Sequence, residues 1–315
     1  MTRDTSLATR QTTRVSCPVS RVSCLAILAA VLTAAALGAA CGAGGSGTEA
    51  SNKVKVTATL GLFRDLVQQV GSDRVQASAL VPDGSDPHTY EPPPSQIAKL
   101  SQAKLVVMNG LNLEAGLGKT VRENASSSAT VLELAAGLPT LDDNPHLWLD
   151  VQNAMTYVER IRDALVSIDP AGADIYRANA DGYLGELRTL DQEVSGAVQS
   201  IPAERRKLVT FHDAYPYLAH RYGLEIVGFV VESGGKEPSA QQVSDLANAI
   251  RDEKVPAVFK EPQFSARILE LAASDAGVQV CSLYSDALDS KVKTYVELMR
   301  FNAQELARCL GGAGG

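Results

Sequence analysis

Three histidines and one aspartate have the residue types of a metal-binding set. The chain contains only four histidines. His88 and His146 each follow a proline in a polar loop, and His212 ends a short apolar run. Asp286 occupies the loop after the last expected strand, and three neutral imidazoles with one carboxylate form a four-coordinate set that suits Zn²⁺. The remaining histidine, His220, falls on an expected helix, where we expect it at the surface.

The spacing of these candidates argues against a compact zinc finger. Successive candidates are 58, 66 and 74 residues apart along the chain. In open α/β sheets, ligands bind beyond the carboxyl ends of the strands, which is where all four candidates fall. We therefore expect two sheets, one in each half of the chain, to face each other and to contribute two ligands each across a cleft.

Short apolar strands alternate with helices in both halves of the chain. This order is typical of an α/β protein with parallel sheets and right-handed crossovers. In the first half, we expect strands at 53–59, 75–81, 104–109 and 129–134, and helices at 62–70, 95–103 (opened by Ser95), 113–124 and 148–168. In the second half, we expect strands at 207–211, 225–231, 257–260 and 278–283, and helices at 214–222, 239–253, 264–276 and 292–310.

A long helix is expected between these halves. Apolar residues from Tyr176 to Val194 keep a 4-3-4-3-4 spacing with no internal proline, which makes one continuous stripe. At ~1.5 Å per residue, such a helix would span roughly 40 Å, the width of a pair of domains. We interpret it as a rigid connection between an N-terminal lobe (53–168) and a C-terminal lobe (203–311), with the linking segment at 169–202. The alternative is a buried helix within a single domain.

The N-terminus has the features of an export signal. Basic residues precede the apolar stretch 25–37, which is too short to span a bilayer comfortably and is followed by small residues. We interpret 1–40 as a signal peptide, Cys41 as a lipidated cysteine, and the glycine-rich 41–52 as a flexible tether. A plain secretory signal, leaving a soluble protein with a free thiol, is the alternative.

Charge and cysteine content restrict the functional class further. Because residues 1–40 carry four cations and one anion, their removal changes the formal net charge from −7 to −10. This acidity argues against nucleic acid as a partner, because phosphates demand a basic face. In an exported protein, Cys281 and Cys309 indicate a disulfide, with two buried thiols as the alternative.

Seven segments that include these candidates resemble one known family. The sequence is similar, from about residue 53 to 310, to the zinc- and manganese-binding solute-binding proteins (cluster A-I) of bacterial ABC transporters. The resemblance rests on segments 86–95, 144–150, 211–217, 222–224, 237–239, 259–263 and 285–288.

The resemblance implies a fold, a ligand set and partners. Members of the family have two α/β lobes joined by one long helix, and their ligand positions match His88, His146, His212 and Asp286. Manganese-preferring members usually carry glutamate where His212 stands, so an imidazole there favours zinc. Many zinc members carry a long histidine-rich loop before the second ligand histidine, whereas 138–144 is short and has no histidine.

The expected function is therefore a monomeric, non-enzymatic receptor outside the cytoplasm. It would capture Zn²⁺ and deliver it to a membrane permease driven by a cytoplasmic ATPase. Glu261 is a candidate hydrogen-bond acceptor beside the ligands or a residue that orients a loop. We expect Trp148 and Tyr217 to pack in the core or between the lobes rather than to contact the metal. The alternatives are a manganese-binding homologue, a surface adhesin, and a zinc hydrolase, whose open coordination position Asp286 would fill.

Overall fold

The computed structural model describes residues 53–233 and 238–312. These described residues belong to one compact unit. The expected signal peptide 1–40, Cys41, the tether 41–52 and Glu237 lie outside the described residues. Within the described part of the chain, no helix is long and apolar enough to cross a membrane.

Two four-stranded parallel sheets confirm the predicted fold class. The first sheet has the order β2-β1-β3-β4, and the second has the equivalent order β6-β5-β7-β8. The strands of the first sheet are β1 (Val54–Ala58), β2 (Val75–Ala79), β3 (Leu105–Met108) and β4 (Thr130–Glu133). Those of the second are β5 (Lys207–His212), β6 (Glu225–Val231), β7 (Ala257–Lys260) and β8 (Gln279–Ser282). All eight strands coincide with the apolar runs in the sequence.

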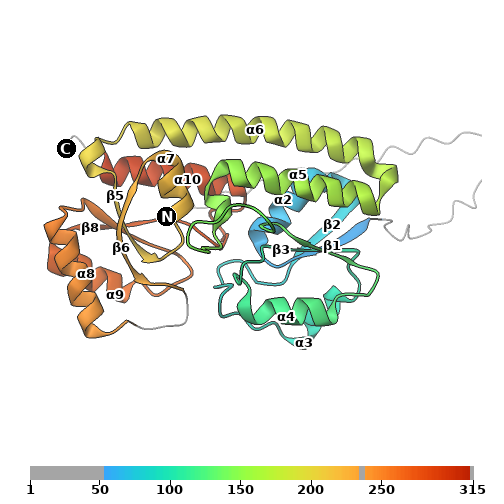
Figure 1. Ribbon diagram of the computed structural model, residues 1–315, viewed down its shortest axis with the longest axis horizontal. Helices are drawn as coiled ribbons and strands as arrows, with labels where there is room; N and C mark the ends of the chain where they lie inside the picture. Colours follow the sequence, from blue (N-terminus) through green and yellow to red (C-terminus); the bar gives the residue numbers. More distant parts are fainter. Residues whose placement is uncertain (1–52, 234–237, 313–315) are drawn as a thin grey trace, which may run out of the picture. The chain divides into compact units, whose positions relative to one another are not determined.

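Helices cover both faces of each sheet. Figure 1 shows α3 (Pro94–Leu100) and α4 (Ala115–Asn124) on one face of the first sheet, and α8 (Ala240–Asp252) and α9 (Arg267–Ala276) on one face of the second. The other faces are covered by α2 (Gly61–Gly71), α5 (Val151–Ile168), α7 (Pro216–Tyr222) and α10 (Tyr295–Leu310), and α6 (Ala173–Gln199) lies across these helices. Each lobe is therefore a three-layer α/β structure.

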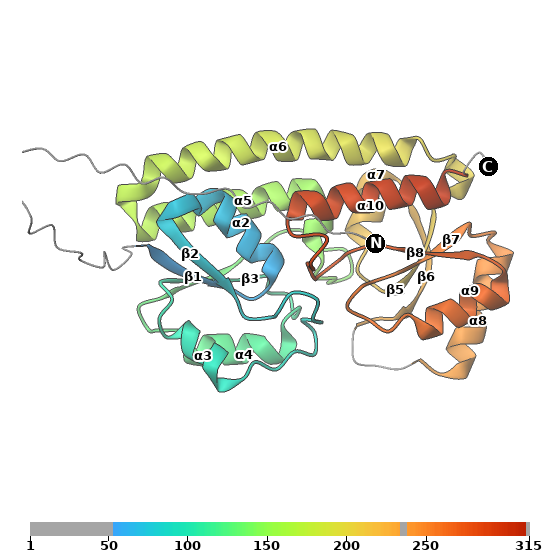
Figure 2. The same cartoon turned by 180° about the vertical axis from the view of Figure 1, so that it is seen from behind.

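The long connecting helix is present as α6. It has 27 residues and follows a 3₁₀ turn at Pro170–Gly172. It packs against α5 and α2 of the first lobe and against α7 and α10 of the second lobe. Figure 2 shows α10 running beside it. The hydrophobic core under α6 is continuous between the lobes, whereas the opposite face of each sheet has a separate core. The lobes are thus joined by shared packing as well as by the chain.

Helix starts differ most from the sequence-based expectation. Ser95 does not cap its helix: α3 begins one residue earlier, after Pro93, because a proline in the first turn already has a helical φ and needs no N–H partner. The helix expected from residue 148 begins at Val151, where the Asp150 side chain accepts a hydrogen bond from the Gln152 amide. Similarly, α10 begins after Thr294, whose side chain caps the Glu297 amide.

Candidate metal centre

All four predicted ligands lie at the carboxyl ends of strands, in the gap between the sheets. His212 is the last residue of β5, and Asp286 lies in the loop between β8 and α10. His88 follows β2, and His146 follows β4, immediately before a 3₁₀ turn at Leu147–Leu149. Each lobe therefore contributes two of the four candidate residues to this place.

The ligand atoms of the four side chains form a compact cluster. One ligand atom from each residue lies within 4.8 Å of all the others. The Nε2 atom of His146 is 3.4 Å from that of His88 and 3.3 Å from that of His212. The Asp286 oxygens lie 3.4–3.6 Å from the three Nε2 atoms. A tetrahedral ion with bonds of about 2.0–2.1 Å has ligand atoms about 3.3–3.4 Å apart, so the donor set fits zinc dimensions.

The cluster is almost completely removed from water. His146, His212 and Asp286 are buried, and the His88 side chain is 10% exposed. Neither Asp286 oxygen has a hydrogen-bond partner within the described structure. An unpartnered buried carboxylate is energetically costly unless a cation compensates it. A cation bound between this carboxylate and the three imidazoles would compensate its charge.

Burial and the neighbouring charges shift the pKa values of these groups in opposite directions. Burial opposes a charge on His212, but Glu261 and Asp286 outweigh it and raise the imidazole pKa to about 10. Burial lowers the pKa of His146 well below its usual value. Burial also favours a protonated Asp286, yet the three imidazoles outweigh it and hold the carboxyl pKa well below its usual value. The carboxylate is therefore ionised and ready to bind a cation.

Hydrogen bonds orient two of the rings. His212 Nδ1 lies 2.7 Å from Glu261 Oε1, as expected for a carboxylate beside the ligands. His146 Nδ1 lies 2.8 Å from Asn144 Oδ1. In each case an oxygen holds the Nδ1 hydrogen, so that the neutral ring, the form that binds a metal, directs its Nε2 lone pair at the cluster.

Ser285 and Gln263 extend the Glu261 network. The Ser285 hydroxyl donates to Glu261 Oε2, and Gln263 Nε2 donates to the Ser285 hydroxyl at 3.0 Å. Glu261 therefore connects His212 to the residue that precedes Asp286. Ser285 was not predicted to have a role, although it directly precedes Asp286 in the sequence.

Trp148 and Tyr217 join the lobes, as expected. Trp148 Nε1 donates to the Ser285 carbonyl at 3.0 Å, and the Tyr217 hydroxyl donates to the Asn144 carbonyl at 2.7 Å. His220 is exposed on α7, away from the cluster. Asn144 was not predicted to have a role, although it belongs to the Asn-Pro-His segment.

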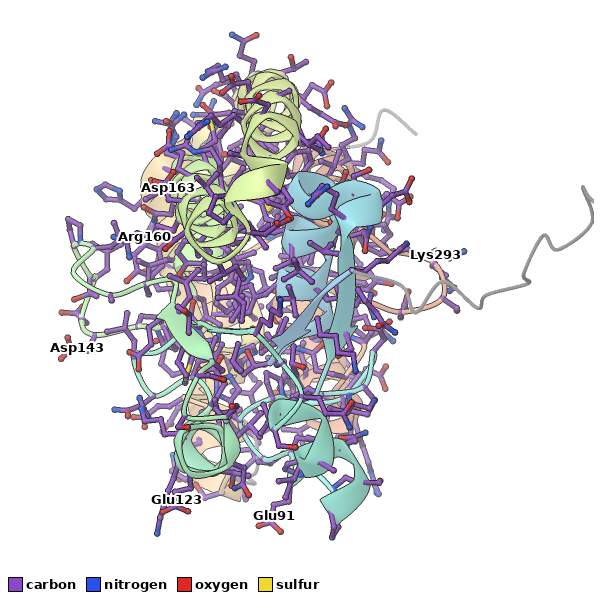
Figure 3. The ribbon with its side chains drawn as sticks, turned by 90° about the vertical axis from the view of Figure 1, so that its right-hand side faces the viewer. Glu91, Glu123, Asp143, Arg160, Asp163 and Lys293 are labelled. Atoms are coloured by element: carbon purple, nitrogen blue, oxygen red, sulfur yellow. A yellow bond between two sulfur atoms is a disulfide. The ribbon has the colours of Figure 1, made fainter. Side chains whose placement is uncertain are left out.

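A cavity of about 300 Å³ lies beside the cluster and reaches the surface. His88 and His146 line it together with the acidic side chains Asp143, Asp213 and Glu232. Figure 3 shows Asp143 at the outer edge of its loop, away from the first sheet. Acidic side chains therefore share this cavity with two of the candidate ligands.

A disulfide joins Cys281 of β8 to Cys309 of α10. Both cysteines are buried. Asn302 of α10 also donates to the Tyr284 carbonyl and accepts from the Tyr284 amide, at 2.7 and 2.8 Å. These contacts hold the loop that carries Asp286 against α10.

Comparison with known proteins identifies relatives along nearly the whole described chain. The family described as "zinc-uptake complex component A periplasmic" matches residues 56–309. The manganese-binding lipoprotein MntA of Halalkalibacterium halodurans is 35% identical over 86% of this chain and 94% of its own. The iron-binding protein YfeA of Yersinia pestis is 32% identical over 84% of this chain and 88% of its own.

Solved structures have the same fold. The periplasmic zinc-binding protein TroA of Treponema pallidum superimposes with a TM-score of 0.78 at 29% identity, over 82% of this chain and all of its own. Together with the family match, this likeness accounts for both sheets and for the connecting helix. The chain belongs to the family of the periplasmic zinc-uptake component, the metal-binding, solute-binding proteins of ABC transporters.

Proposed function

We propose that this protein captures Zn²⁺ outside the cytoplasm and delivers it to the permease of an ABC importer. Zinc is its cargo, and His88, His146, His212 and Asp286 are its ligands. The observation that carries the proposal is the buried, unpartnered Asp286 carboxylate facing three Nε2 atoms at tetrahedral spacings. Three imidazoles and one carboxylate are a borderline-soft set, which favours zinc over manganese.

Manganese is the second candidate cargo. It is supported by the similarity to MntA, which is named for manganese binding, over most of both chains. The two cargoes differ in the ligands they favour, because manganese suits carboxylate and water oxygens better than imidazole. The identity of the residue at position 212 is therefore the feature that separates them.

A metal titration with matched variants tests this function. Protein purified without added metal is analysed for its elements and then titrated with Zn²⁺ and Mn²⁺ in competition. We expect one zinc per chain and a preference for zinc. His212→Ala should weaken zinc binding by at least about 100-fold, since it removes one of four ligands from a site of the zinc type.

His220→Ala is the control, because it removes an exposed histidine outside the cluster. His212→Glu should move the preference towards manganese by supplying a harder ligand. Equal zinc affinity of wild type and His212→Ala would remove His212 from the ligand set. A wild-type preference for manganese would establish the second candidate instead.

The proposal includes anchoring to the outer face of the cell membrane through a lipid on Cys41. It is supported by the cysteine that follows the apolar N-terminal stretch and by relatives named as lipoproteins. Cys41→Ser should release the protein from the membrane fraction. Equal membrane retention of this variant and the wild type would contradict lipid anchoring at Cys41.

A further inference from the structure

We propose that Asn144 is a positioning residue that couples retention of the metal to the contact between the two lobes. This inference rests on the proposed function, because it assumes that His146 binds the metal. The Asn144 side chain contacts one candidate ligand through its oxygen and the opposite lobe through its nitrogen. We call this pair of contacts the Asn144 bridge.

The first contact of the Asn144 bridge fixes the His146 ring. Asn144 Oδ1 accepts from the His146 amide at 3.1 Å and lies 2.8 Å from His146 Nδ1. Because the amide N–H can only donate, the side-chain oxygen must face His146. Nδ1 therefore carries the proton, and Nε2 presents its lone pair to the cluster.

The second contact of the Asn144 bridge reaches the other lobe. Asn144 Nδ2 donates to the Asp213 carbonyl at 2.7 Å, and Asp213 directly follows His212. A carboxamide can make both contacts because it has an acceptor and a donor on one planar group. The side chain that orients a ligand in the first lobe is thus bonded to the residue beside a ligand of the second.

Trp148 makes a comparable contact on the other side of His146, but in a different environment. Trp148 Nε1 donates to the Ser285 carbonyl, and the Trp148 carbonyl accepts from the Tyr295 hydroxyl at 2.7 Å. Trp148 is fully buried, whereas Asn144 is 9% exposed and lines the cavity beside the cluster. Water can therefore replace the Asp213 carbonyl at Asn144 far more readily than it can replace the Ser285 carbonyl at Trp148.

The consequence is that lobe separation on the cavity side breaks the Asn144 bridge first. The amide then loses its fixed orientation, and the His146 ring loses its oxygen partner. A metal bound to His146 fixes the ring. The ring in turn fixes the Asn144 side-chain amide in the orientation that donates to the Asp213 carbonyl. By thermodynamic reciprocity, metal binding and lobe contact then stabilise each other.

Asn144→Asp separates the two contacts. A carboxylate can still accept from His146, but it cannot donate to the Asp213 carbonyl. Its added negative charge would by itself slow the release of a cation. Asn112→Asp is the matched control, because Asn112 is exposed and lines the same cavity, so the variant adds the same charge there.

The measurement is the rate of Zn²⁺ release from the loaded full-length protein into excess chelator. We expect Asn144→Asp to release zinc about 3- to 10-fold faster than wild type, the scale of one lost hydrogen bond. Asn112→Asp should release zinc at the wild-type rate or more slowly. The visible spectrum of bound Co²⁺ should be the same in Asn144→Asp and wild type, because His146 remains oriented.

Asn144→Ala removes both contacts and provides a second test should Asn144→Asp not fold. It should weaken zinc binding by about 10- to 100-fold, as expected when the hydrogen-bond partner of a ligating histidine is lost, and should change the Co²⁺ spectrum. Release from Asn144→Asp no faster than from Asn112→Asp, or unchanged zinc affinity in Asn144→Ala, would overturn the inference. A wild-type protein that binds no metal would instead refute the proposed function.

Discussion

The two lobes have the same strand order but place different chemistry at equivalent points. In each lobe, a buried glutamate beyond the third strand accepts a hydrogen bond from a side chain at the end of the first strand. In the second lobe these residues are Glu261 and His212, 2.7 Å apart. In the first lobe they are Glu114 and Thr59, 2.8 Å apart.

Both lobes therefore place a buried glutamate beside the end of the first strand. The residue at that strand end differs, and only His212 is a candidate metal ligand. Glu114 also accepts from the Asn109 and Gly110 amides, so it organises the loop after β3. Its charge is opposed by burial, which raises its pKa. The first lobe instead carries its candidate ligands on the loops after β2 and β4, the outer strands of its sheet.

The second lobe also differs in having a covalent connection. Replacing Cys281 and Cys309 together with alanine should lower the free energy of unfolding by about 2–4 kcal/mol, since the bond closes a loop with a sequence separation of 28. Urea unfolding of the two forms measures this difference. A loss much below 1 kcal/mol would mean that packing of α10 holds β8 without the disulfide.

Removing each glutamate tests whether the two carboxylates have different roles. Glu261→Gln should weaken zinc binding by about 10- to 100-fold, because a neutral amide is a weaker partner for His212 Nδ1. Glu114→Gln should leave zinc affinity unchanged and lower stability by about 1 kcal/mol through its altered hydrogen bonds. Competition titration and urea unfolding separate the two effects, and equal losses of affinity in both variants would contradict this division.

Asp191 connects the long helix α6 to both lobes. It accepts hydrogen bonds from Gln152 of α5 and from Arg221 and Tyr222 of α7. Asp191→Asn should cost about 1–2 kcal/mol, because the partner Arg221 is 36% exposed and solvent screens part of the interaction. Thermal unfolding at neutral pH measures this cost.

The same variant should show a defined pH dependence. Burial raises the pKa of Asp191, but the hydrogen bonds from Arg221 and Tyr222 outweigh it and lower the pKa below its usual value. The stabilisation is therefore complete above about pH 4 and is lost as the pH falls through the lowered pKa. The difference in stability between wild type and Asp191→Asn should become smaller under those acidic conditions. A stability difference that stays constant down to pH 3 would show that the substitution changes packing rather than removing a charge.

Local patterns were sufficient for the elements and for the candidate ligands. Apolar runs of strand length identified all eight strands, and the proline-free stripe identified α6, because the periodicity of apolar residues can be read from a short stretch of sequence. The first residues of the helices were predicted less accurately. Several neighbouring residues can begin a helix: α3 begins at Pro94, which has no N–H to satisfy, and α5 begins after Asp150, whose side chain caps the Gln152 amide.

The sequence by itself determined the two-lobed α/β class and the identity of the four residues that cluster between the lobes. It could not determine the contacts of Asn144 with Asp213 or of Trp148 with Ser285, which join residues 69 and 137 positions apart. Nor could it pair Glu261 with His212. These contacts depend on how α6 and the shared core orient the two sheets, and only the tertiary structure fixes that orientation.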